Sequence, residues 1–259
     1  MRWLVVVPWL LALGCGEDPA PPSGAVRGAA SSDAIWVLSY NVNFERPSDA
    51  TVRAIDEADA DLVFLQETHE RWERSIRRRL ESRYPTILFR HAPGEGGMAI
   101  LSRYEIVEAR HETARGGAFP AWRVTARTPL GDLDVLHVHL HPPLDEDGGL
   151  VVGYFTTSDA RTREILHHLS GPPPDLVLGD FNEGEGPAIT QLESLGMRQA
   201  QAAHPPLELT WSWDTGTAEL EGRPDHVFVG PAYRPTAVQV MLRGGSDHRP
   251  LRVAIERAR

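Results

Sequence analysis

Short apolar segments with the character of β-strands recur along almost the whole chain, and this recurrence limits the possible folds more than any other feature. An apolar run of about four to eight residues bounded by turn residues is typical of a buried strand. Strands are expected at residues 35–40, 62–65, 86–90, 98–102, 105–110, 121–128, 133–139, 176–178, 226–229, 236–241 and 251–255. Helices are expected at residues 48–58, 70–83, 159–169 and 187–195. Many strands with a few intervening helices predict an α/β fold in which two packed sheets are flanked by helices.

The N-terminus has the pattern of a secretory signal. Arg2 precedes an apolar run at residues 3–13, which is too short to cross a bilayer as a helix. Cys15 is the sole cysteine, so no intrachain disulfide can form, and it follows a small residue at the end of the run. Residues 1–15 therefore resemble a bacterial lipoprotein signal peptide with Cys15 as the lipidated residue; the alternative is an ordinary signal peptide with a chance cysteine. We expect an extracytoplasmic protein, in the periplasm or on the cell surface, that is lipid-anchored to a bacterial membrane.

The composition after this signal changes from linker-like to globular. Residues 16–33 are rich in Pro, Gly, Ala and Ser and predict a flexible linker, followed by a single domain at residues 34–259, which we expect to be a monomer. The net charge is −10, and all 26 basic residues are Arg. An acidic chain lacks the positive field that draws proteins onto polyanions, which argues against a nucleic-acid scaffold protein but not against a nuclease. The Arg run at residues 77–79 is interpreted as a solvated helix face.

Six segments place polar side chains at the ends of apolar strands, where the strand fixes the geometry and the adjoining loop gives access. They lie at residues 39–43, 65–67, 137–141, 179–182, 224–226 and 246–250. In this order they resemble the endonuclease/exonuclease/phosphatase superfamily, which includes DNase I-like nucleases, apurinic-site endonucleases, inositol-polyphosphate phosphatases and bacterial sphingomyelinases. The resemblance covers residues 34–257, and the Gly-Asp-Phe-Asn and Ser-Asp-His-Arg-Pro segments are its most specific pair. It implies a four-layer α/β/β/α sandwich and metal-dependent hydrolysis of phosphoesters.

Oxygen-bearing side chains in these segments suit a hard divalent cation. Mg²⁺ and Mn²⁺ prefer oxygen ligands, and Mg²⁺ usually keeps several waters and takes only one or two carboxylates. The resemblance implies that Glu67 supplies a charged oxygen, that Asn41 supplies a neutral one, and that Asp247 lies near the metal. The alternative for Asn41 and Glu67 is a structural role at a turn and at the start of the following helix.

Asp180 and Asn182 follow a buried strand and lie two residues apart. In an extended conformation both would face the same side and could meet one phosphate, with Phe181 in the core. The resemblance implies that Asp180 orients the attacking water and that Asn182 contacts the phosphate. The alternative is a plain Asx turn.

The remaining catalytic candidates are two histidines and one carboxylate. The resemblance implies that His248 binds the phosphate or acts as a general acid or base, which an imidazole can do near neutral pH. It also implies that Asp225 orients His248 and that His139 is catalytic. Because His137, His139 and His141 share one strand face if the strand stays regular, a three-histidine zinc site is an open alternative.

Two hypotheses for the reaction share these site residues. The first is a metal-dependent phosphodiesterase or phosphatase that acts on a small or lipid-derived phosphoester. The second is a DNase-like endonuclease or exonuclease. A third reading, a non-catalytic surface-binding lipoprotein on the same fold, is weaker because no matched catalytic position is replaced.

Overall fold

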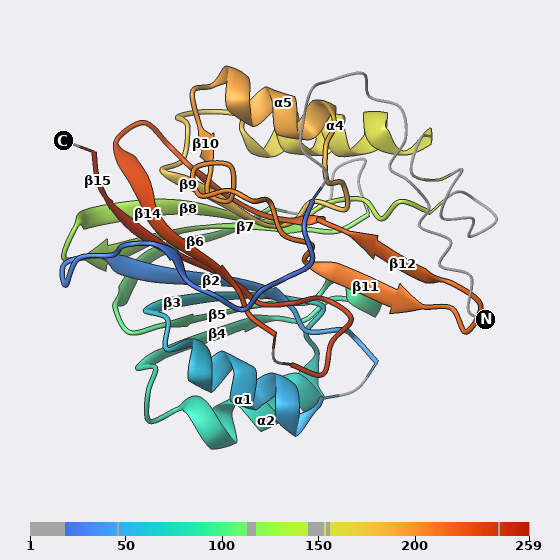
Figure 1. The fold of residues 1–259 in the computed structure, drawn as a ribbon. Coiled ribbons are helices and arrows are strands. Elements are labelled where there is room, and N and C mark those ends of the chain that lie inside the picture. Colours follow the sequence, from blue (N-terminus) through green and yellow to red (C-terminus); the bar gives the residue numbers. More distant parts are fainter. Residues whose placement is uncertain are drawn as a thin grey trace.

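The computed structural model describes residues 19–45, 47–112, 118–144, 153, 156–242 and 244–258. The predicted signal segment, including Cys15, lies outside the described residues. Among the residues that the structure describes, no helix combines the length and the apolar character needed to cross a membrane. Two large sheets pack face to face and helices cover both outer faces (Figure 1), so the predicted sandwich is confirmed.

The first sheet has seven strands in the order β1-β14-β15-β2-β3-β5-β4. Their bounds are β1 Arg27–Gly28, β2 Ile35–Asn41, β3 Leu62–Gln66, β4 Thr86–Arg90, β5 Met98–Ser102, β14 Tyr233–Val240 and β15 Leu251–Arg257. Strands β2 and β3 run parallel, so their C-terminal ends lie at the same edge of the sheet. A 3-10 turn, η1 (Gly94–Gly96), precedes β5.

The second sheet has six strands in the order β10-β13-β9-β8-β7-β6. Their bounds are β6 Glu105–Glu112, β7 Ala121–Thr128, β8 Gly131–His139, β9 Leu176–Asp180, β10 Arg198–Gln199 and β13 Asp225–Val229. Strands β8 and β9 run parallel, whereas β13 is antiparallel to β9. A separate hairpin of β11 (Trp211–Asp214) and β12 (Glu219–Gly222) projects from the sandwich (Figure 1).

Alternation along the strands builds the layers. Val37 and Phe64 belong to the core between the two sheets, whereas Leu38 and Leu65 on the same strands pack beneath helices α1 (Asp49–Ala58) and α2 (Glu70–Leu80). In the second sheet the residues facing away from the central core pack against helices α4 (Ser158–His168) and α5 (Pro187–Ser194). Side chains alternate between the two faces of a strand, and here both faces of each sheet are covered. The strands are therefore nearly continuous apolar runs.

Part of the predicted linker is bound to the domain. Strand β1 pairs with β14, and the backbone N–H of Ala20 donates to the carbonyl of Leu207. Ser23 donates from its backbone N–H and its hydroxyl to Oε1 of Glu208, which is 1% exposed. The prediction of a flexible linker over residues 16–33 is therefore wrong for residues 20–31. Backbone hydrogen bonds hold this stretch, and they do not depend on apolar side chains.

Candidate active site

Asp180 lies at the centre of a cluster of polar side chains at one end of the sandwich. It ends β9, and the strand register places it beside His139 at the end of β8 and beside Asp225 at the start of β13. Its Oδ2 atom lies 3.7 Å from Nε2 of His139 and 3.7 Å from Nε2 of His248. Because the residue is only 1% exposed, its carboxylate faces two imidazoles with almost no contact with bulk water.

Asn41 joins the carboxylates of the two sheets. Its Nδ2 atom donates to Oε1 of Glu67 at 2.8 Å and to Oδ2 of Asp180 at 2.9 Å. The other oxygen of Glu67 accepts from the backbone N–H of Phe44 at 2.8 Å. Glu67, His139 and Asp180 each offer a ligand atom, and these atoms all lie within 4.8 Å of one another. Motifs from both sheets therefore meet at one site.

The charges of this cluster fit a divalent cation. Burial raises the pKa of Glu67, and burial also raises the pKa of Asp180 despite the opposing effect of the positive His248. Buried carboxylates that have lost their hydration need a compensating positive charge. A metal between Glu67 and Asp180 would supply that charge, and a mostly oxygen donor set suits Mg²⁺ or Mn²⁺.

The predicted role of Asn41 as an oxygen ligand depends on which way its amide faces. Here Nδ2 faces the two carboxylates, and Oδ1 accepts from the backbone N–H of Asn43 at 3.0 Å. A cation at the carboxylates would repel the NH₂ group and favour the reversed amide, with Oδ1 toward the ion. The ligand role of Asn41 therefore stays a prediction.

Asp247, also predicted to lie near the metal, is beside the cluster rather than within it. Its Oδ1 atom accepts from Nδ2 of Asn43 and its Oδ2 atom from Nε1 of Trp211, both at 2.9 Å. Among the described residues, three groups of side chains have ligand atoms close enough to share one metal ion, and Asp247 belongs to none of them. These bonds position the segment that carries His248, and a metal-binding role for Asp247 stays a prediction.

Asp225 fixes the orientation of His248. Its Oδ2 atom lies 2.9 Å from Nδ1 of His248, and its own backbone N–H donates to the hydroxyl of Thr210. The carboxylate therefore keeps a proton on Nδ1 and leaves Nε2 facing Asp180. This is the general arrangement in which a buried carboxylate sets both the tautomer and the ring position of a working histidine.

The two histidines that flank Asp180 have pKa values shifted in opposite directions. Burial by itself lowers the pKa of His248, but the carboxylates of Asp225, Asp180 and Asp247 outweigh it and raise this pKa to about 10. Burial also lowers the pKa of His139, and Asp180 offsets that effect only in part. At neutral pH His248 is therefore a cation and His139 is neutral, a division that suits a hydrogen-bond donor and a proton acceptor.

Asn182 differs from its prediction. It has φ 53° in the left-handed region, so it does not continue the extended strand of Asp180. Its backbone N–H donates to Oδ1 of Asp180 at 2.8 Å, and its Nδ2 donates to the carbonyl of Leu140 at 2.8 Å. Phe181 is buried in the core as predicted. An Asx turn thus replaces the extended pair, and the proposed phosphate contact of Asn182 stays a prediction.

Backbone conformations that L-residues rarely adopt are concentrated at this cluster. Of the four non-glycine residues with positive φ among those described, three lie here: Asn43 (64°), Glu67 (62°) and Asn182 (53°). Such conformations cost about 1–3 kcal/mol each and persist where the surroundings hold them in place. Asn43 and Asn182 lie two residues beyond Asn41 and Asp180, the last residues of β2 and β9, and Glu67 directly follows β3. The strained turns therefore lie at the strand ends that form the site.

The three-histidine zinc alternative is not supported by the geometry. His137 is fully buried, its Nε2 atom lies 2.6 Å from Nε2 of Gln66, and burial lowers its pKa to about 3. His141 directs Nδ1 at the carbonyl of Pro142. Among the described side chains, neither histidine belongs to a group with metal-binding spacing. His226, to which the sequence assigns no role, is buried against the carbonyl of Glu183.

Two residues of the site are given no role by the sequence. Asn43 joins Asp247 to the Asn41 turn, but an asparagine two residues beyond a strand end is common in loops. Phe119 stacks on the imidazole of His139 with ring centroids 4.1 Å apart and an interplanar angle of 20°. Its place just before β7 gives no hint of this contact, because the two residues meet only through the fold.

A cavity of about 190 Å³ adjoins His248. It is lined by Ser212, Leu242, Gly244, Ser246, Asp247, His248 and Arg249. Arg249 lies at its wall, and within the described part of the chain its Nη1 atom is buried without a hydrogen-bond partner. A guanidinium N–H without a partner can donate a hydrogen bond to an anionic oxygen.

Solved structures of known proteins share this fold. TDP2 of D. rerio, complexed with a single-strand DNA product, has a TM-score of 0.67 at 16% identity, covering 87% of this chain and 100% of that chain. An endonuclease/exonuclease/phosphatase from Beutenbergia cavernae has a TM-score of 0.63 at 18% identity, covering 87% and 72%. A family protein from Bacteroides thetaiotaomicron has a TM-score of 0.61 at 17% identity, covering 86% and 97%. Comparison with curated protein sequences gives no match.

A family model extends the similarity from the fold to the sequence. The model described as Endonuclease/Exonuclease/phosphatase family matches residues 38–248, a range that begins within β2 and ends at the histidine held by Asp225. The residues of the catalytic cluster, from Asn41 to His248, lie within that range, and the matched stretch exceeds half of the chain. The chain therefore belongs to the endonuclease/exonuclease/phosphatase family.

Proposed function

We propose that this protein is an Mg²⁺- or Mn²⁺-dependent phosphodiesterase or phosphatase. The observation that carries the proposal is the position of the Asp180 carboxylate, 3.7 Å from Nε2 of both His139 and His248 and in one cluster with Glu67. Phosphoester hydrolysis needs an oriented water, a cation on the phosphate and a donor for the oxygen that accumulates charge. The ligand atoms of Glu67, His139 and Asp180 lie within 4.8 Å of one another, so these groups can act on one phosphate.

Each side chain has a task that follows from its surroundings. Asp180 accepts a hydrogen bond from the attacking water, orients it and helps to remove its proton. Neutral His139 contacts the same water or a phosphate oxygen. Protonated His248 donates from Nε2 to a phosphate or leaving-group oxygen. A metal held by Glu67, with Asn41, would neutralise charge on the phosphate.

The cavity beside His248 favours a substrate with a further polar group next to the scissile phosphate. Arg249 and the hydroxyls of Ser212 and Ser246 line it, whereas Leu242 is 60% exposed at its rim. A small or lipid-derived phosphoester, whose headgroup enters the cavity and whose apolar part leaves along Leu242, fits this mixture. The overall charge of −10 provides no general positive field for an extended polyanion, so binding of one would have to rely on local groups.

We also propose that the protein acts outside the cytoplasm and is tethered to a membrane through a lipid on Cys15. The support is the sequence of residues 1–15. Because residues 20–31 are bound to the domain, only a few residues of sequence separate Cys15 from the domain, which would then lie close to the membrane surface. Cys15→Ser should release the protein from the membrane fraction or block processing; unchanged association would point to another anchor.

A substrate panel tests the reaction. The purified chain is assayed with Mg²⁺ or Mn²⁺ against bis-p-nitrophenyl phosphate, sphingomyelin, inositol phosphates and plasmid DNA. We expect hydrolysis of a small or lipid-derived phosphoester. Cleavage of plasmid DNA alone would favour the nuclease alternative, for which the DNA-bound TDP2 structure is a fold precedent. No hydrolysis of any member, with the metal bound, would favour a non-catalytic surface-binding protein.

A further inference from the structure

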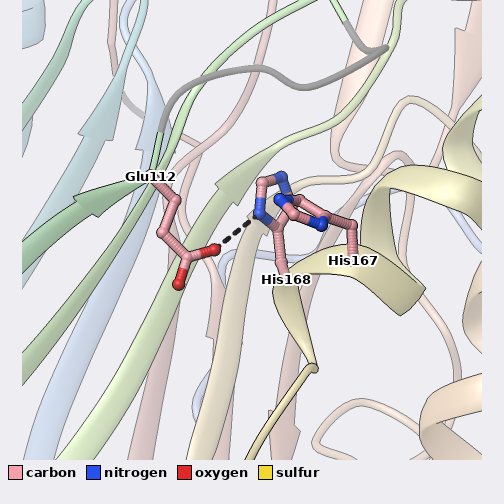
Figure 2. A group of neighbouring side chains, drawn as sticks. All are labelled: Glu112, His167 and His168. Atoms are coloured by element: carbon pink, nitrogen blue, oxygen red, sulfur yellow. Dashed lines mark hydrogen bonds and ion pairs between the residues drawn. The ribbon is translucent and has the colours of Figure 1, made fainter.

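A second cluster of metal-binding side chains lies away from the active site, on the outer side of the second sheet (Figure 2). Glu112 is the last residue of β6, and His167 and His168 are the last two residues of α4. Figure 2 shows the carboxylate of Glu112 pointing at the His168 ring, with the His167 ring beside it. None of the three takes part in the proposed hydrolysis.

The three side chains converge closely enough to share one ion. Oε2 of Glu112 lies 2.9 Å from Nδ1 of His168, and the two imidazole centroids are 5.4 Å apart. Each residue offers one ligand atom, and these atoms all lie within 4.8 Å of one another. Ligand atoms at about 2.0–2.2 Å from a tetrahedral zinc are about 3.4 Å apart, so small rotations of the side chains close the site.

The ligand chemistry of this cluster differs from that of the active site. Two imidazole nitrogens and one carboxylate oxygen suit Zn²⁺ and other borderline transition-metal dications rather than Mg²⁺. Three protein ligands and a water complete a tetrahedral site. His168 is 3% exposed and is thus already positioned, whereas Glu112 and His167 are partly exposed and can adjust.

Helix α4 also reaches the active site from the same face. Glu164, one turn before His168, accepts from the backbone N–H groups of Ala118 and His141 at 2.8 and 2.7 Å. Ala118 precedes Phe119, the residue that stacks on His139. Glu112 and Ala118, the described ends of the β6–β7 connection, are therefore both hydrogen-bonded to α4. An ion at the second cluster would strengthen the attachment of Glu112.

We propose that Glu112, His167 and His168 form a structural binding site for a zinc-class transition-metal ion, which fastens the end of β6 to the C-terminus of α4. The competing explanation is a simple hydrogen bond between His168 and Glu112 at a helix end, where a histidine is favourable without any metal. The two explanations differ in what they require of His167, because only a metal site needs the second imidazole.

Metal titration of the full-length protein separates them. The protein is stripped with a chelator, returned to excess Mg²⁺ so that the oxygen-rich catalytic cluster is occupied, and titrated with ZnCl₂ by calorimetry, with bound zinc counted by mass spectrometry. We expect one zinc per chain under these conditions. We expect His167→Ala and Glu112→Gln to raise the Kd for zinc at least about 100-fold, since losing only a hydrogen-bond partner of a ligand already costs about 10- to 100-fold.

The matched control is His91, which forms a 2.7 Å pair with Glu73 on the surface. The separation is similar to that of His168 and Glu112, although His91 uses Nε2 where His168 uses Nδ1. Among the described residues, His91 and Glu73 belong to no group of side chains whose ligand atoms could share a metal ion. His91→Ala should leave zinc binding unchanged. The proposal is overturned if no zinc binds in the presence of Mg²⁺, or if His167→Ala and His91→Ala have the same effect. The titration uses no phosphoester, so its outcome is independent of the proposed hydrolysis.

Discussion

The catalytic cluster and the Glu112–His167–His168 cluster contain similar side chains but are built in different ways. In the catalytic cluster, His139, Asp180 and Asp225 occupy neighbouring positions on three paired strands, and Glu67 comes from the other sheet. A shift of one residue in this register would turn the side chains to the opposite face. The outer cluster joins one strand end to one helix end, so side-chain rotation alone can form or open it. The first site is fixed by the fold, whereas the second tolerates adjustment.

The two clusters also differ in the number and the burial of their carboxylates. Burial raises the pKa values of both Glu67 and Asp180, and a neighbouring carboxylate adds to the rise in each case, Asp247 for Glu67 and Asp225 for Asp180. The outer cluster has one partly exposed carboxylate, already bonded to His168. Metal at the first site would therefore serve chemistry, and metal at the second would serve attachment.

Metal removal should give the largest effect. We expect EDTA to abolish phosphoester hydrolysis and Mg²⁺ or Mn²⁺ to restore it, because the buried carboxylates need the cation to hold a phosphate. Glu67→Gln should raise the metal concentration needed for half activity, because the change removes one ligand charge. Initial rates measured across a metal titration test both expectations.

The same titration can overturn the assignment of the oxygen-rich cluster as the catalytic metal site. His137→Ala is the control, because among the described residues this buried histidine belongs to no group of side chains whose ligand atoms could share a metal ion. If the protein carried tightly bound zinc that His137→Ala removed, while Glu67→Gln stayed fully active, the three-histidine site would replace the oxygen-rich one.

Asp180→Asn should lower kcat by at least about 10²-fold, the usual scale of a general acid–base contribution. The substitution keeps the shape but removes the charge that orients the water, and His139→Ala and His248→Ala should lose similar amounts. Steady-state kinetics at saturating metal measure the effect, with His91→Ala, at a surface His–Glu pair outside the cluster, as the control. A fall of less than about threefold in Asp180→Asn would remove the central residue from the mechanism, since one factor of ten corresponds to about 1.4 kcal/mol of barrier.

Asp225→Asn should change the pH dependence of kcat more than it changes the folded structure. Asp225 is the largest of the charges that raise the pKa of His248 to about 10. Without it, burial is opposed by fewer carboxylates and the His248 pKa falls, so the protonated form is lost at lower pH. We expect the alkaline limb of the kcat–pH profile to move toward neutrality. An alkaline limb that stayed in place would show that protonated His248 does not limit the reaction.

The sequence predicts the catalytic cluster well because its residues follow strands. Apolar runs place β2, β3, β8 and β9, and polar residues at the strand ends must then meet at shared edges. Asn182 shows the limit of that logic, since the strand ends at Asp180 and a left-handed turn follows. The turn depends on a hydrogen bond to Leu140, 42 positions away in the chain, which no local pattern encodes.

Regions held by backbone or by distant contacts are those that the sequence misses. Residues 20–31 have the composition of a linker, yet β1 pairs with β14 and Ser23 bonds to Glu208, 185 positions away. Composition indicates whether a segment can build a core, but it does not reveal a strand added at a sheet edge. The outer metal cluster is hidden for the same reason: Glu112 and His168 are 56 positions apart and meet only because β6 passes the end of α4.

Phe119→Leu should give the smallest effect and would show whether α4 matters to catalysis at all. The stacked ring holds the imidazole of His139 from one side, and Glu164 holds the preceding backbone N–H of Ala118. An aromatic pair contributes about 0.5–1.5 kcal/mol beyond its buried area, so we expect kcat to fall about two- to tenfold with little change in KM. Phe119→Tyr keeps the stack and should restore most of the rate. If Phe119→Leu instead raised KM and left kcat unchanged, Phe119 would contact the substrate rather than position His139, and the link from α4 to the catalytic histidine would be broken.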